Sequence, residues 1–301
     1  MFQWEHRLTL QPYTNKDSAS MVSRFLQAGV LAACLAASTG HTMPLRSEHA
    51  IVISDETGQV VMEKSADTIV PIASLTKLLT AMVVLDSKPD MEEKISIESE
   101  DVDLLKHSKS YVPVGTTLPR KKILELALMS SDNRAAAALA RTYPGGEPAL
   151  IRAIAVKARA LGMTNTVIKE PTGLSPENTS TATDLARMAL AASRYPQIAA
   201  ITTDREDAIS MNGRSRTFHN TNRLVGATGW DVLLSKTGFT NEAGHCLIMR
   251  IKQAGKQATL VLLNANGSPS RMLDALRIRQ YLTAHKTTAP VPRYPTVVAK
   301  R

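Results

Sequence analysis

Three short motifs in this 301-residue chain carry groups that could transfer an acyl group. In chain order they are Ser74-Leu75-Thr76-Lys77, Ser131-Asp132-Asn133 and Lys236-Thr237-Gly238. The first motif sets a hydroxyl nucleophile beside an amine base, the second adds a hydroxyl beside an amide, and the third offers a cation for an anionic substrate. Each motif alone is a weak signal, but the ordered set predicts nucleophilic acyl transfer.

The nucleophile and the base must lie on the same side of one element. Ser74 begins the apolar run SLTKLLTAMVVLDS shortly after Pro71, where a helix start is expected. Positions i and i+3 of a helix share a face, so Ser74 and Lys77 would lie side by side while the leucines pack into a core. The alternative is an ordinary capping serine and a solvated lysine, which the presence of the other two motifs disfavours.

The second motif has a competitor with the same pattern, Ser210-Met211-Asn212. The competitor runs into Asn212-Gly213, a dipeptide typical of turns, and has no helical context, so we interpret it as structural. Ser131 instead lies within Lys121–Arg141, a segment with helical apolar spacing. We expect the true motif to lie at a break or loop between two helical pieces.

The other patterns divide into strands toward both ends of the chain and helices in the middle. Strand patterns cover Ala50–Ser54, Gln59–Lys64, Ala208–Met211, Val232–Thr240, Cys246–Lys252 and Ala258–Leu263. Helical spacing covers Lys121–Arg141, Glu147–Leu161, Thr183–Arg194 and Ser268–His285. These elements predict an α+β fold, with an antiparallel sheet flanked by helices and an all-helical subdomain beside it. The third motif would lie on a strand and the first on a helix, where the two parts meet.

Composition and charge narrow the function. A chain of this length with 44% hydrophobic residues can bury a sizeable core, and we expect one globular body. The last sixteen residues contribute +4 of the net charge of +9, and aromatic residues make up 4% without a basic stripe among them. This composition argues against nucleic-acid binding. The histidines, among them His107, His219 and His245, show no HExxH spacing or cysteine partners, so the sequence implies no metal and no cofactor.

The N-terminal segment, residues 1–42, has the pattern of a signal region. A charged stretch from Met21 to Arg24 precedes a short apolar stretch, Phe25–Ala37, and a zone of small residues where cleavage could occur. We therefore expect the protein to be exported. The start codon could be Met1 or Met21.

Two features bear on membrane association. Leu31-Ala32-Ala33-Cys34 resembles a lipobox, in which the cysteine is lipidated, and a small residue inside a cleaved signal peptide is the alternative. The basic tail, residues 286–301, could also favour an anionic surface or could simply be solvated. After cleavage Cys246 would have no disulfide partner, and we expect it to be a buried small hydrophobic residue.

Taken together, these segments resemble the penicillin-binding serine D,D-peptidases, and most of all their D-alanyl-D-alanine endopeptidase branch. The resemblance covers residues 47–285. It is carried by Ala73–Lys77, Leu126–Ala135, Glu170–Ser175 with Thr181–Ala186, and Lys236–Gly244. The NEAGHCLIM segment after the third motif looks most like the endopeptidase branch, and a D-alanyl-D-alanine carboxypeptidase is the alternative. Glu170 stands where the family pattern has aspartate, which leaves the role of that loop open.

The resemblance implies a mechanism on peptidoglycan stem peptides, with β-lactams as covalent inhibitors. Ser74 would attack the carbonyl of a D-alanyl bond, and Lys77 would be the base, made effective by desolvation and by the neighbouring cation of Lys236. Ser131 would relay a proton to the leaving amine, and Asn133 would orient Lys77 or bind the substrate backbone. The implied substrate-binding residues are Lys236, Thr237, Gly238, Phe239 and Thr240, with the backbone N–H groups of Ser74 and Phe239 as the oxyanion hole.

Two rival classes share parts of this pattern. A class A β-lactamase has the same three motifs but needs a glutamate that activates the deacylating water, normally in an ExxLN arrangement. Here Glu170-Pro171-Thr172-Gly173-Leu174-Ser175 has its leucine one place late and no asparagine after it. A non-catalytic cell-wall binding protein would be expected to have a broken motif, and all three are intact.

Overall fold

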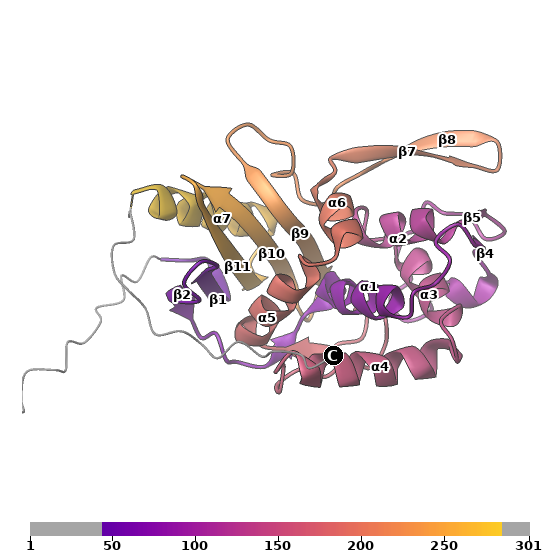
Figure 1. The fold of residues 1–301 in the computed structure, drawn as a ribbon, viewed down its shortest axis with the longest axis horizontal. Helices are drawn as coiled ribbons and strands as arrows, with labels where there is room; N and C mark the ends of the chain where they lie inside the picture. Colours follow the sequence, from indigo (N-terminus) through magenta and orange to yellow (C-terminus); the bar gives the residue numbers. More distant parts are fainter. Residues whose placement is uncertain (1–43, 285–301) are drawn as a thin grey trace, which may run out of the picture. The chain divides into compact units, whose positions relative to one another are not determined.

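The computed structural model describes residues 44–284, whose central element is a five-stranded sheet. The strands lie in the order β2-β1-β11-β10-β9, and each neighbouring pair is antiparallel. Their bounds are β1 Ser47–Ser54, β2 Val60–Lys64, β9 Asp231–Thr240, β10 Gly244–Gln253 and β11 Lys256–Ala265. The sheet therefore joins the two ends of the described chain, as the sequence patterns predict (Figure 1). β9, which carries Lys236, is an edge strand.

Both faces of this sheet are apolar, and successive side chains of a strand contribute to them in turn. Leu247 and Met249 of β10 belong to a buried cluster that includes Ile278 of α7 (Ser268–Ala284). Ile248 belongs to a larger cluster that includes Leu185 of α5 (Ala182–Ala192). Because successive side chains of a strand point to opposite faces, a strand covered on both faces must be apolar at nearly every position. The helices α7 and α5 accordingly cover opposite faces (Figure 1).

A group of helices lies beside the sheet and surrounds α1 (Lys77–Asp86). Every residue of α1 from Lys77 to Val84 is buried, so this helix is enclosed on all sides. Around it are α2 (Arg120–Leu128), α3 (Asn133–Arg141), α4 (Gly146–Ala160), α6 (Pro196–Thr203) and the 3₁₀ helix η1 (Ala73–Thr76). A second 3₁₀ helix, η2 (Ser99–Asp101), packs against α3. The short strands β3 (Val70–Pro71) and β6 (Thr179–Ser180) pair with each other, as do β4 (Lys94–Ser96) and β5 (Thr117–Pro119). This arrangement confirms the predicted α+β fold.

We expected the predicted strand Ala208–Met211 to belong to the main sheet, but it lies outside that sheet. It belongs to β7 (Glu206–Met211), which pairs with β8 (Arg214–His219) in a separate hairpin (Figure 1). The turn between them holds Asn212 at φ 50° and Gly213 at φ 77°, which is the left-handed backbone of a tight hairpin turn. The competitor motif is therefore a strand end and a turn. The sequence did not predict β8 because its side chains are almost all exposed and lack an apolar pattern.

Both ends of the chain fall outside the described residues. The predicted signal region, residues 1–42, and the basic tail, residues 286–301, belong to these ends. Within residues 44–284, none of the helices has the length and apolar character needed to cross a bilayer.

Candidate active site

Ser74 and Lys77 lie side by side, but on two different kinds of helix. Ser74 is in the 3₁₀ helix η1, and Lys77 is the first residue of α1. The preceding residue, Ala73, has a left-handed backbone at φ 48°, which turns the chain sharply before the serine. Lys77 Nζ donates to Ser74 Oγ at 3.0 Å. The predicted spacing of three residues is confirmed, with a tighter turn than an α-helix at the serine.

The ammonium group of Lys77 is enclosed by oxygen acceptors. Its Nζ donates to Asn133 Oδ1 and to the carbonyl of Thr172, both at 2.6 Å, and the residue is 1% exposed. Burial lowers its pKa to about 8, against the opposing effect of the carboxylates of Glu170, Asp132 and Asp103. The lowering therefore comes mainly from desolvation.

Ser131 lies in the loop between α2 and α3, as predicted. Its backbone is left-handed at φ 60°, an unfavourable conformation for a residue with a side chain. Its hydroxyl accepts a hydrogen bond from Lys236 Nζ at 2.8 Å. The strained loop thus brings the second motif against the third.

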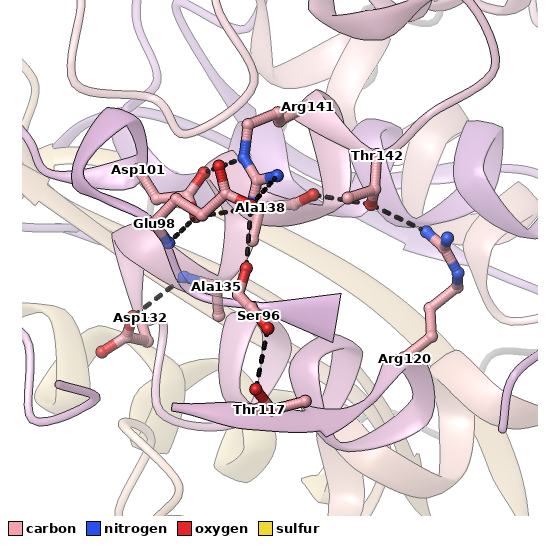
Figure 2. Close-up of polar contacts among 10 residues, drawn as sticks. All are labelled: Ser96, Glu98, Asp101, Thr117, Arg120, Asp132, Ala135, Ala138, Arg141 and Thr142. Atoms are coloured by element: carbon pink, nitrogen blue, oxygen red, sulfur yellow. Dashed lines mark hydrogen bonds and ion pairs between the residues drawn. The ribbon is translucent and has the colours of Figure 1, made fainter. Parts of the chain in front are cut away.

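The helix that follows this loop is fixed at both ends. At its beginning, the Asp132 carboxylate accepts from the backbone N–H of Ala135 at 3.0 Å, which is an N-cap. At its end, Arg141 donates to both carboxylate oxygens of Asp101, at 3.0 and 2.9 Å (Figure 2). A nearly buried carboxylate paired by two parallel bonds is a firm anchor. These contacts hold Asn133, the first residue of α3, in place against Lys77.

Strand β9 supplies the third motif and a second buried lysine. Lys236 is 2% exposed, and its Nζ donates to Ser131 Oγ and, at 3.0 Å, to the carbonyl of Thr237. Burial lowers its pKa well below the ordinary value, helped by the cations of Lys77 and Arg271. Thr237 Oγ1 donates to Thr221 Oγ1 at 2.6 Å. The three motifs are thereby joined into one hydrogen-bonded set.

Close approach of two backbones explains the glycine of the third motif. A Cβ atom at Gly238 would lie 3.1 Å from the carbonyl oxygen of Ile72 and 3.2 Å from the backbone nitrogen of Ser74. Any side chain there would push β9 away from the nucleophile. Gly238 therefore allows the edge strand to run next to Ser74.

The last two residues of β9, Phe239 and Thr240, have different surroundings. Phe239 is 54% exposed, and its ring stacks on that of His245 at 4.4 Å. Burial and the Arg271 cation lower the pKa of His245, so its charged form is disfavoured. Thr240 Oγ1 accepts from the backbone N–H of Ala243 at 3.1 Å and so secures the turn into β10.

The loop that begins at Glu170 completes the surroundings of Lys77. The Glu170 carboxylate accepts from the backbone N–H groups of Thr172 at 2.7 Å and Gly173 at 2.6 Å, and from Asn178 Nδ2 at 2.9 Å. These bonds shape the loop so that the Thr172 carbonyl faces Lys77 Nζ. The role that the sequence left open for Glu170 is therefore to hold this loop. Thr172 accepts from Lys77 through its backbone carbonyl, a group that every residue type has, so the sequence could not indicate this contact.

Gly173 should tolerate no side chain. A Cβ atom there would lie 2.0 Å from the carbonyl oxygen of Ala73, and its φ is +88°. We expect Gly173→Ala to displace the loop from Lys77, to lower the stability by about 2 kcal/mol or more, and to slow acylation. Thermal unfolding and penicillin labelling rates measure both effects. The control is Gly115→Ala, at φ +84° with no heavy atom within 4 Å of its Cβ, and an equal fall in melting temperature in the two variants would contradict this prediction.

Arg271 is a site residue that the sequence patterns did not indicate. It comes from α7, is 6% exposed, and donates through Nη1 to the carbonyls of Cys246 at 2.7 Å and Gly238 at 3.4 Å. Among the described residues its Nε has no hydrogen-bond partner and no carboxylate pairs with it. A buried cation behind β9 without an anion favours an anionic ligand at this strand. Cys246, next to it, is fully buried, as predicted.

Within the part of the chain that the structure describes, no group of three or more His, Cys, Asp or Glu side chains lies close enough to hold a metal ion.

Comparison with known proteins gives a consistent result. Residues 36–267 match the sequence profile of the family described as D-alanyl-D-alanine carboxypeptidase. The chain is 43% identical over 277 residues to a D-alanyl-D-alanine endopeptidase of Pseudomonas aeruginosa, covering 90% of this chain and 89% of that protein. It is also 43% identical over 259 residues to a D-alanyl-D-alanine endopeptidase of Escherichia coli, covering 85% and 83%.

The fold has a counterpart among solved structures. The DD-transpeptidase of Streptomyces K15 superposes with a TM-score of 0.75 at 26% identity, over 81% of this chain and 99% of that one. The family profile covers far more than half of the chain, and the relatives in both bacteria align along most of their length. The chain therefore belongs to the D-alanyl-D-alanine carboxypeptidase family of penicillin-binding serine D,D-peptidases.

Proposed function

We propose that this protein is a D-alanyl-D-alanine endopeptidase that cleaves cross-links between peptidoglycan stem peptides through an acyl-enzyme on Ser74. The observation that supports this most is the hydrogen-bonded set that joins all three motifs, with Lys77 Nζ 3.0 Å from Ser74 Oγ and Lys236 Nζ 2.8 Å from Ser131 Oγ. The two relatives named endopeptidases, each 43% identical, favour this activity over carboxypeptidase activity.

In the proposed mechanism, the neutral amine of Lys77 accepts the proton of Ser74 Oγ as that oxygen attacks the D-alanyl carbonyl. Ser131 relays to the leaving amine the proton that Lys77 took from Ser74, so Lys77 is neutral again. Water then hydrolyses the ester, which releases the acyl part as a carboxylic acid and restores the Ser74 hydroxyl. Asn133 orients Lys77, since its Oδ1 accepts from Nζ at 2.6 Å. A lysine amine can serve as base near neutral pH when burial has lowered its pKa, as it has here to about 8.

The proposed substrate site follows the edge of β9. An extended peptide can add to an exposed strand edge, with the carboxylate of its leaving part near the cations of Lys236 and Arg271 and the hydroxyl of Thr237. Gly238 lets the peptide approach Ser74, and the backbone N–H groups of Ser74 and Phe239 would stabilise the oxyanion. Thr240 would support the far end of the strand through its bond to the turn.

The contacts of Glu170 argue against a class A β-lactamase. Deacylation in those enzymes needs a glutamate that is free to activate water. Here the Glu170 carboxylate is occupied by backbone N–H groups of its own loop and by Asn178. We therefore propose that penicillins acylate Ser74 stoichiometrically and are released slowly.

The decisive experiment compares two natural substrates. Purified protein is incubated with cross-linked muropeptide dimers and, separately, with monomeric pentapeptides, and the products are resolved by mass. We expect dimers to split into monomers without loss of terminal D-alanine from the pentapeptide. Release of D-alanine with intact dimers would instead establish the carboxypeptidase alternative, and turnover of nitrocefin with neither reaction would establish a β-lactamase.

We further propose that residues 47–285 form the catalytic domain, that residues 1–42 direct export to the periplasm, and that residues 286–301 form a basic tail. The signal pattern and the bacterial relatives support export. Lipidation at Cys34 is the remaining alternative to simple cleavage. Incorporation of labelled lipid that is lost in Cys34→Ala would establish lipidation, and incorporation that survives the change would exclude it.

A further inference from the structure

One loop connects the two sides of the site. This loop, Asp103–Tyr111, contacts α3 where Asn133 Nδ2 donates to Ser108 Oγ at 2.7 Å. It also reaches the turn between β9 and β10, where Lys106 forms an ion pair with Glu242. The Lys106–Glu242 pair therefore joins the Asn133 side of the site to the far end of the strand that carries the third motif.

The backbone of this loop has hydrogen bonds of its own, apart from the Lys106–Glu242 pair. The Asp103 carboxylate accepts from the backbone N–H groups of Leu105 at 2.8 Å, Lys106 at 3.0 Å and Ser108 at 2.8 Å. Burial would raise the pKa of Asp103, but these hydrogen bonds outweigh it and lower the pKa. The backbone of the loop at Lys106 is thus held without a contribution from Glu242.

The direction of a bound peptide places this pair beside its acyl part. The leaving carboxylate is expected at the cations of Lys236 and Arg271, and the reacting carbonyl at Ser74, next to Gly238. The rest of the acyl part must then run the other way along β9, past Phe239 toward the turn that holds Glu242. The residue just before the scissile D-alanine would meet the Lys106–Glu242 pair.

The Lys106–Glu242 ion pair can separate at a small cost in free energy. Its side chains are 30% and 38% exposed, and ion pairs with that much contact to water contribute little stability. A ligand that satisfies both ions can therefore replace it at little cost. Leu104 and Leu105, 78% and 59% exposed on the same loop, offer apolar contact for the stem of such a group.

We propose that Lys106 and Glu242 are specificity-determining residues that open to bind a side chain ending in both an amino group and a carboxylate, on the residue before the scissile D-alanine. The carboxylate pairs with Lys106 and the amine with Glu242. A side chain with one charge would leave one ion unpaired, and a neutral side chain would leave the pair closed. This inference rests on the proposed acyl-enzyme chemistry at Ser74.

The test uses three synthetic acyl-D-alanyl thioglycolate esters, whose thiol release reports acylation for an endopeptidase and a carboxypeptidase alike. The residue before D-alanine is 2,6-diaminopimelate, lysine or norleucine. We expect the natural protein to prefer the diaminopimelate ester by at least about tenfold in kcat/KM. In Lys106→Met and Glu242→Gln this preference should disappear, mainly through a higher KM.

The matched control is Lys109→Met, on the same loop, whose Nζ lies 4.6 Å from the centre of the Tyr111 ring. Lys109→Met should keep the full preference. Titration with a fluorescent penicillin counts the active sites of every variant and corrects for misfolded protein.

Equal rates for the three esters in the natural protein would overturn the proposal. So would an equal loss for all three esters in the variants, which would show the pair to be a structural clamp. Lack of both penicillin labelling and thiol release in the natural protein would refute the proposed function instead.

Discussion

Replacing Ser74 with alanine is expected to abolish covalent labelling by a fluorescent penicillin and to lower peptide cleavage by about 10⁴-fold or more. The expectation follows from the removal of the only atom that forms the proposed acyl-enzyme, since knocking out the nucleophile of a serine hydrolase removes nearly the whole covalent route. The fold should survive, because the Ser74 hydroxyl accepts from Lys77 at the site and does not pack in the core. Denaturing gels with labelled penicillin and muropeptide assays measure the two effects.

The control for this experiment is Ser87→Ala. Ser87 follows α1, and its hydroxyl donates to the Val84 carbonyl at 2.7 Å, away from the hydrogen-bonded set. Ser87→Ala should be labelled at the rate of the natural protein. Continued covalent labelling of Ser74→Ala would mean that another residue is the nucleophile, and the assignment of Ser74 would be wrong.

The rate of acylation by penicillin is expected to rise with pH through the pKa of Lys77, which burial lowers to about 8. The base must be neutral to accept the proton, so acylation should fall about tenfold for each pH unit well below that value. Lys77→Met should be slower by about 10²–10⁴-fold at and above that pH, and its rate should not follow this titration. Lys77→Arg keeps the charge but cannot act as a base, because guanidinium remains protonated. It should be as slow as Lys77→Met.

The control here is Lys121→Met, which removes an exposed lysine paired with Glu92 and should leave the pH profile unchanged. A flat profile between pH 6 and 9 in the natural protein would contradict a base with this pKa. Normal activity in Lys77→Arg would show that Lys77 contributes only its charge. These outcomes separate proton transfer from simple electrostatic support.

Several features of this protein follow from the sequence because they depend on neighbours along the chain. The spacing of Ser74 and Lys77 places them on one turn, and the continuous apolar runs of β10 and β11 mark these strands of the sheet. The Asn212-Gly213 pair identifies a hairpin turn and so excludes the competitor motif. The helical spacing of Lys121–Arg141 predicts the two helical pieces on either side of Ser131.

Other features were decided only by the tertiary structure. The backbone carbonyl of Thr172 accepts a hydrogen bond from Lys77, and Arg271 of α7 donates to the carbonyl of Gly238. Lys106 forms an ion pair with Glu242, which is 136 residues away in the sequence. None of these contacts has a periodic or local pattern, because each joins segments that meet only after the sheet and the helices have packed. The lowered pKa of Lys77 likewise comes from burial, which is a property of the folded chain. The sequence by itself determined which groups could react, and the tertiary structure decided which of them meet and in what state of charge.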